Sequence, residues 1–128
     1  MKRFAKTVAT IAGVCALATA FAGPALAHHS FAMFDQTKII EKNRATVAEF
    51  RFTNPHSFIV VNVQEGGNVT RYVLECSSVN MMSQGGWKYN TLKAGDKVDL
   101  TFYPLRGGKP GGMLKTIKVA DGRVLKAW

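Results

Sequence analysis

Three histidines, His28, His29 and His56, are the residues of this chain whose types and spacing could bind a metal ion. The first two follow the small-residue pattern A-L-A at positions 25–27, at which a signal peptidase cuts. A cut after Ala27 makes His28 the first residue, so that its free α-amine and its ring nitrogen can chelate a metal together. Copper(II) is the first candidate, because it binds nitrogen ligands most tightly among the divalent first-row metals.

A chelate of two nitrogens at a chain end is weak and mobile, so a defined site needs a further ligand from the folded body. His56 is the remaining imidazole, and the proline of Asn54-Pro55 restricts the direction of its loop. An α-amine has a reference pKa of about 7.7–8.0, so a metal displaces its proton near neutral pH at modest cost. We therefore predict a metal site built from His28, His29 and His56. The alternative is that the adjacent pair is merely polar sequence at an unstructured chain end.

Sulfur ligands and catalysis receive less support from the sequence. Met33, Met81, Met82 and Cys76 could add the soft sulfur that copper(I) prefers, but methionines are more often core residues. The alternation of residues 69–76 turns Cys76 inward, so we expect it to be a small buried core residue. The sequence around it also lacks the features of a catalytic nucleophile. Glu75 on the opposite face is expected to be a cap or an ion-pair partner. We therefore do not expect an enzyme.

Residues 1–27 have the layout of a secretory signal peptide. Three basic residues within positions 1–6 precede an uncharged stretch rich in Ala, Val, Ile and Leu. This stretch is short for a membrane span, which needs about 20 apolar residues. The sequence predicts a soluble protein of the periplasm or the exterior, cleaved after Ala27, with no stable membrane span afterwards. An earlier cut after the A-F-A pattern at 20–22 and a retained anchor helix are the alternatives.

The 101 residues after the predicted cut suffice for one domain. Of the 17 Lys plus Arg residues, three precede the cut, so 14 remain against 8 Asp plus Glu, a formal charge of +6. This charge favours anionic partners such as an envelope component, whereas nucleic acid is not expected outside the cytoplasm. Cys76 is the one cysteine after the cut, so no intrachain disulfide is possible. The basic excess is concentrated near the end of the chain, at Arg106, Lys109, Lys115, Lys118, Arg123 and Lys126.

The sequence from residue 44 onward has the pattern of short strands separated by turns, which predicts a 28–43 N-terminal segment and a 44–128 β-domain. Alternation places Ala48, Phe50 and Phe52 on one face of the first strand. Glycines at 66–67 predict a tight hairpin between the second and third strands. A short helix is expected after Ser77 or Ser78, ending at Gly85. The predicted strands cover 44–52, 57–63, 69–76, 97–102, 113–119 and 124–128.

Three strands, a short helix and two or three further strands are the order of a small OB-like five-stranded β-barrel, and an all-β fold of this type is predicted. A small β-sandwich is the alternative fold. The barrel suggests a second function, an OB-type envelope module that binds a protein or an anionic ligand through its basic and aromatic surface. The aromatic residues considered for that surface are Phe58, Tyr72, Trp87 and Tyr103.

The chain also resembles a family of short exported bacterial proteins known only as a domain of unknown function. The resemblance rests on Glu75 and on the motifs H-H-S-F at 28–31, N-P-H-S at 54–57, G-W at 86–87 and L-K-A-G-D-K-V at 92–98. It implies a bacterial periplasmic location and no established activity. The chain departs from the family pattern at Phe52-Thr53, where a tryptophan often precedes N-P-H, and at Val79, where a proline is common. Cys76 is expected to be particular to this member.

Overall fold

The computed structural model describes residues 29–128, so the predicted signal peptide and His28 lie outside the described residues. Two units are distinguished along the chain. The described part of the first unit is the four-residue helix α2 (His29–Ala32). The second unit, Met33–Trp128, contains the strands and is the one that carries the candidate site.

The second unit is all-β with one short helix, as the sequence predicts. Six strands in the described residues form one sheet in the order β3-β2-β1-β4-β5-β6. The first strand begins at Ile40, four residues before the predicted strand. The strands are β1 (Ile40–Arg51), β2 (Phe58–Glu65), β3 (Asn68–Glu75), β4 (Lys97–Pro104), β5 (Gly111–Lys118) and β6 (Val124–Lys126).

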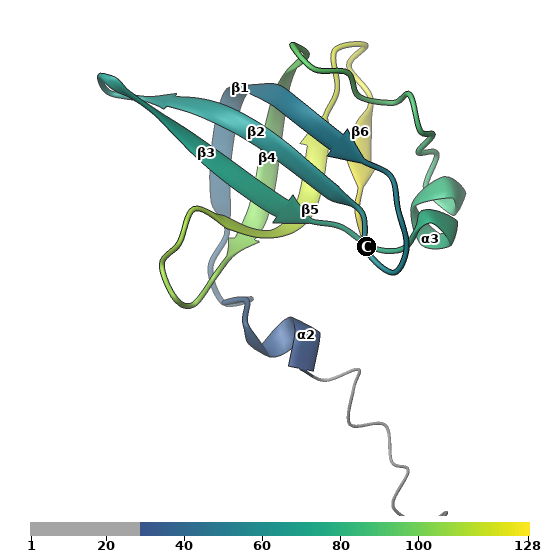
Figure 1. Cartoon of the computed structure of the whole chain (residues 1–128), viewed down its shortest axis with the longest axis horizontal. Helices are drawn as coiled ribbons and strands as arrows, with labels where there is room; N and C mark the ends of the chain where they lie inside the picture. The colour runs from purple at the N-terminus through teal and green to yellow at the C-terminus, as the bar shows by residue number, and fades with distance from the viewer. Residues whose placement is uncertain (1–28) are drawn as a thin grey trace, which may run out of the picture. The chain divides into compact units, whose positions relative to one another are not determined.

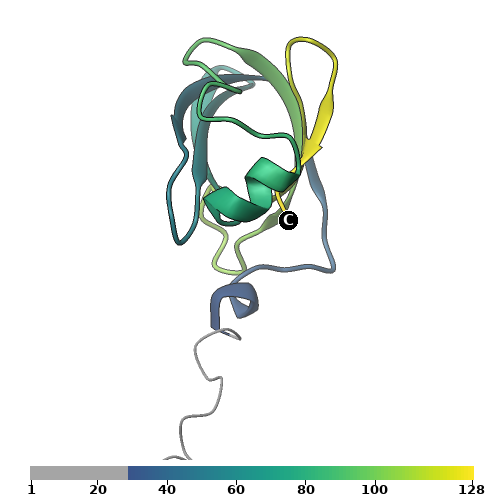
Figure 2. The same cartoon turned by 90° about the vertical axis from the view of Figure 1, so that its right-hand side faces the viewer.

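Strands β1 to β5 close into a barrel, because β3 also pairs in parallel with β5 (Figures 1 and 2). The circular order 1-2-3-5-4-1, with a helix between β3 and β4, is the order expected for an OB-like barrel. Strand β6 extends the sheet by pairing with the end of β5. Closure removes the free edges that a β-sandwich would leave, so the barrel prediction is confirmed.

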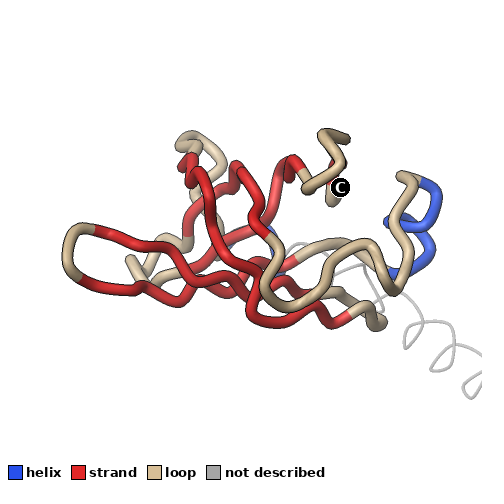
Figure 3. Tube along the Cα trace, turned by 90° about the horizontal axis from the view of Figure 1, so that it is seen from above, coloured by secondary structure: helices blue, strands red, loops and turns tan. Residues whose placement is uncertain are grey.

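The β2–β3 hairpin fixes which residues face each other across two strands. Its turn is Gly66-Gly67, and Gly66 has a φ of 59°, which glycine adopts without steric cost. Pairing runs without interruption from Glu65 opposite Asn68 to Phe58 opposite Glu75. The tip of the hairpin projects from the barrel, as Figure 3 shows from above. This register brings the loop before β2 next to the end of β3.

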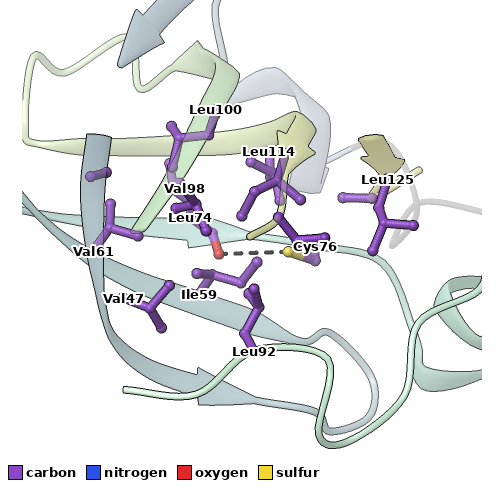
Figure 4. Packing of buried hydrophobic residues seen from close by; sticks show 14 of the residues in the cluster. Val47, Ile59, Val61, Leu74, Cys76, Leu92, Val98, Leu100, Leu114 and Leu125 are labelled. Atoms are coloured by element: carbon purple, nitrogen blue, oxygen red, sulfur yellow. Dashed lines mark hydrogen bonds between the residues drawn. The ribbon is translucent and has the colours of Figure 1, made fainter. Parts of the chain in front are cut away.

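The barrel interior holds a single apolar cluster, part of which is drawn in Figure 4. Val98, Leu100 and Phe102 of β4 point inward, as the alternation predicts. The prediction for β1 is wrong in detail. A β-bulge between Val47 and Glu49 shifts the register, so Val47 is buried in the core and Ala48 only partly buried.

Helix α3 (Val79–Gln84) lies at one end of the barrel (Figure 2). Ser78 is its N-cap and accepts a hydrogen bond from the backbone N–H of Met81, and Gly85 is its C-cap. Both ends therefore agree with the predicted helix. Met82 anchors the helix through its buried side chain. Within residues 29–128, no helix combines the length and the apolar character needed to cross a membrane.

Candidate functional site

His56 lies in the loop between β1 and β2, which is held in place by hydrogen bonds at both of its sides. The Ser57 hydroxyl donates to the Thr53 carbonyl at 3.1 Å and accepts from the Thr53 N–H at 3.2 Å. The side-chain oxygen of Asn54 accepts from the backbone N–H of Val79 at 3.0 Å, which ties the loop to helix α3. The Asn54-Pro55 peptide bond is cis. The hydrogen bonds of Ser57 and Asn54 therefore hold the backbone from which His56 projects.

The imidazole of His56 is oriented through its Nδ1 atom. This nitrogen lies 3.1 Å from the carbonyl oxygen of Cys76 and 3.1 Å from Oε1 of Glu75. A carbonyl oxygen can only accept a hydrogen bond, so Nδ1 must carry the hydrogen. In the neutral ring, Nε2 is then left with its lone pair, and it makes no hydrogen bond with the described residues. The side chain is 31% exposed, which leaves it accessible to a ligand.

The carboxylate of Glu75 is the half-buried partner of this histidine. Burial raises the pKa of the Glu75 carboxyl, and attraction to His56 opposes this rise. Glu75, expected to be a cap or an ion-pair partner, contacts His56 at hydrogen-bond distance, and the contact is an ion pair when the imidazole is protonated. A histidine whose second nitrogen donates to a carboxylate is the arrangement that orients metal-ligating imidazoles in proteins. The pair can therefore hold one ligating nitrogen in a defined direction.

Glu75 also borders a small apolar cavity on the outer surface of the barrel. The cavity has a volume of about 150 Å³ and is lined by Phe58 and Val73 from neighbouring strands. Met33 lines it as well, and its carbonyl accepts a hydrogen bond from the Arg106 N–H at 2.9 Å. The chain therefore enters the barrel unit on the side where Glu75 lies.

The aromatic neighbour of His56 is Trp128, whose ring centroid lies 5.6 Å from that of the imidazole. The sequence placed Trp128 in the predicted strand 124–128 and did not indicate it as a site residue; in the structure β6 ends at Lys126 and Trp128 lies beyond it. Glu75 could have been matched to His56 from the hairpin register, since Phe58 opposes Glu75 and His56 precedes Phe58 by two residues. The site thus combines side chains from the β1–β2 loop, the end of β3 and the segment after β6.

The other predicted ligands are only partly placed. The backbone of His29 begins helix α2, whereas His28 precedes the described residues. The part of the chain that the structure describes contains no group of three His, Cys, Asp or Glu side chains able to hold a metal. The site of His28, His29 and His56 therefore stays a prediction.

Cys76 is fully buried, as predicted, and its sulfur lies 3.9 Å from the Leu74 carbonyl (Figure 4). Burial raises the pKa of the Cys76 thiol far above its usual range, so it remains protonated at neutral pH. Met82 is likewise a core residue, while Met81 is exposed and lies on the surface of α3. Neither buried sulfur is available as a surface ligand.

The predicted aromatic surface requires correction. Trp87 is only 1% exposed, because the chain turns at Gly86 and directs the indole into the core, where it donates a hydrogen bond to the Lys126 carbonyl at 2.8 Å. Tyr72 is partly buried, with its ring centroid 5.6 Å from that of Phe102, and it also lines a surface cavity beside Lys42. Phe58 and Tyr103 do line surface cavities.

Comparison with known proteins agrees with the resemblance seen in the motifs. The model of a family of unknown function, DUF6152, matches residues 16–115, which is most of the chain. The chain therefore belongs to this family. No curated protein and no solved structure matched it.

Proposed function

We propose that this chain is a small metal-binding protein of the bacterial envelope, with copper(II) as the first candidate ion. His56 supplies the fixed ligand, and His28 and His29 supply the mobile ones after the signal peptide has been removed. The observation that carries the proposal is the position of His56 Nδ1, 3.1 Å from both the Glu75 carboxylate and the Cys76 carbonyl. Because these two acceptors occupy Nδ1, the lone pair of Nε2 is the one offered to a metal.

The length of the chain before the barrel supports the same proposal. Met33 and Glu75 line one cavity, and Glu75 contacts His56 directly. His28 lies five positions before Met33, and five residue steps of extended chain span about 17 Å. A processed chain that begins at His28 is thus long enough for its amine to approach a metal held by His56.

Copper(II) suits the chemistry of these ligands better than the other common divalent ions. The amine and three imidazoles are nitrogen donors, and copper(II) lies at the top of the affinity order for such sites. The Met33 side chain is 49% exposed beside the cavity, and its thioether adds a donor that copper(I) favours. A site with both kinds of donor fits a protein that binds copper in either oxidation state.

Copper titration of the processed protein tests the proposal. The protein is produced with its own signal sequence and without a polyhistidine tag, and its intact mass is measured first. We expect a chain that begins at His28 and binds one copper(II) at least about 10-fold more tightly than a free peptide of residues 28–32. Affinity is measured by competition with a chelator while the visible absorbance is followed.

Variants of the fixed ligand give the matching controls. His56→Ala should reduce the affinity to that of the free peptide. Glu75→Gln should reduce it by about 10-fold, the lower end of the effect of removing an outer-shell partner. Glu41→Gln removes an exposed carboxylate of β1 and should leave the affinity unchanged. Unchanged tight binding in His56→Ala, or a mature chain that starts elsewhere, contradicts the proposal.

A further inference from the structure

A second cavity lies on the outer surface formed by β4, β5 and the segment after β6. Its volume is about 230 Å³. It is distinct from the cavity beside Glu75, since the two share no lining residue. The residues that line it include Tyr103, Met113, Lys115, Thr116, Lys126 and Trp128.

The floor of this cavity is apolar and enclosed. Met113 lies directly opposite Tyr103 in the register of β4 and β5. Its side chain is only 4% exposed, although it is not part of the core cluster inside the barrel. A residue on the outer face is buried to this degree only when neighbouring side chains cover it, so Tyr103 and Trp128 form walls above an apolar base. An apolar cavity floor of this kind can bind a flat apolar group.

The rim of the cavity is positively charged. Lys115 and Lys126 are both exposed, and the Lys115 ammonium lies 5.7 Å from the centroid of the Tyr103 ring. Neither lysine belongs to an ion pair between described residues, and no Asp or Glu lines the cavity. Their charges therefore remain available to an anionic group.

We propose that this cavity binds a small planar anion, a single ring that carries a carboxylate or phosphate group. The ring lies on Met113 between the two aromatic side chains, and its anionic group approaches Lys115 and Lys126. The size is suitable, because an apolar cavity of about 150 Å³ accepts one benzene ring in another protein. A cavity of about 230 Å³ accommodates a ring with one charged substituent.

The proposed anion site adjoins the proposed metal site, since Trp128 contacts His56 and lines the cavity, and Met113 lies opposite Glu75 in the register of β3 and β5. Its test therefore uses protein treated with a chelator, so that failure of one proposal does not decide the other. The variants also leave Trp128 intact. Lys115→Gln and Lys126→Gln remove one rim charge each, and Lys118→Gln removes one charge from the same strand outside the cavity.

The experiment is a titration of uniformly ¹⁵N-labelled protein, followed by amide chemical shifts, with benzoate and phenyl phosphate as the probes. Benzamide tests the need for the charge, and acetate tests the need for the ring. We expect saturable shifts at residues 113–116 and 126–128, with a dissociation constant in the millimolar range for ligands of this size. Benzamide and acetate should bind at least about 10-fold more weakly.

Each rim variant should weaken benzoate binding at least about 3-fold, and Lys118→Gln should leave it unchanged. Added salt should weaken benzoate binding as well, since the rim charges are exposed. Equal binding of benzamide and benzoate would overturn the proposal. Shifts outside the cavity, or an equal loss in all three lysine variants, would also overturn it by indicating attraction to the net charge alone.

Discussion

At the scale of single residues, the chemistry of His56 is set by the oxygen atoms around its Nδ1. The Cys76 carbonyl cannot change its role as an acceptor, so it fixes the ring tautomer whatever the charge on Glu75. The negative charge of the Glu75 carboxylate raises the basicity of Nε2, on the other side of the ring, and so makes it a stronger metal ligand. The Cys76 carbonyl thus fixes the tautomer and orientation of the ring, and the Glu75 carboxylate increases the donor strength of Nε2.

The Glu75 carboxyl should make the stability of the protein depend on pH. Burial raises its pKa in the folded chain, so the folded state holds this proton more tightly than the unfolded state does. The stability gained from the proton is present at low pH and is lost as the pH rises through the folded-state pKa. Glu75→Gln, which stays uncharged, should therefore be more stable than the wild type at pH 7 and equally stable near pH 3.5. Urea midpoints at the two pH values measure this difference.

The matched variant for this experiment is Glu41→Gln, because Glu41 is an exposed carboxylate on β1. It should show no such pH-dependent advantage. A Glu75→Gln variant that is less stable than the wild type at pH 7 would contradict the argument, because attraction to His56 would then outweigh the cost of burying the charge.

At the scale of elements, closure of the barrel depends on the first residues of β5. Gly112 packs so closely against β4 that a Cβ atom placed on it would lie 2.1 Å from the carbonyl oxygen of Tyr103. Gly111 is similarly close to the Val73 carbonyl of β3. These two glycines therefore let β5 pair with β4 and β3 at once, and Pro110, in the loop just before them, lines the cavity beside Glu75.

Gly112→Ala should destabilise the protein by about 2–3 kcal/mol, because backbone atoms must move to accept the methyl group. Urea denaturation monitored by tryptophan fluorescence measures this loss. Gly107→Ala is the control, since nothing lies within 4 Å of the position of its Cβ. The control should change stability by less than about 1 kcal/mol. Equal stability of the two variants would show that β5 is not tightly packed against β4 at Gly112.

Most of the elements could be predicted from local patterns. Alternation identified the inward faces of β3 and β4, and the Gly66-Gly67 turn identified the hairpin register. The bulge at Val47 could not be predicted, because it depends on how β1 meets two partners with different registers. The burial of Trp87 was also missed. The sequence analysis considered Trp87 for the aromatic surface, but the turn at Gly86 directs its indole into the core.

At the scale of the whole molecule, the barrel brings distant segments to the candidate site. His56 and Glu75 lie 19 positions apart in the sequence, and the indole of Trp128 reaches His56 from the segment after β6. The pair was predictable from the hairpin, but the tryptophan was not, because its approach requires the closed barrel with β6 added beside β5. The excess of positive charge, by contrast, is a property of the sequence that the fold distributes along the later strands and turns.

The central claim is that His56 and the processed N-terminus bind the same metal ion. The most direct measurement is the loss of amide signals when copper(II), which is paramagnetic, is added to ¹⁵N-labelled protein that begins at His28. We predict that substoichiometric copper broadens the amide signals of residues 29–33 together with those of residues 56–57 and 75–77, and that His56→Ala abolishes the broadening at residues 56–57 and 75–77. Broadening confined to residues 29–33 in the wild-type protein would contradict it.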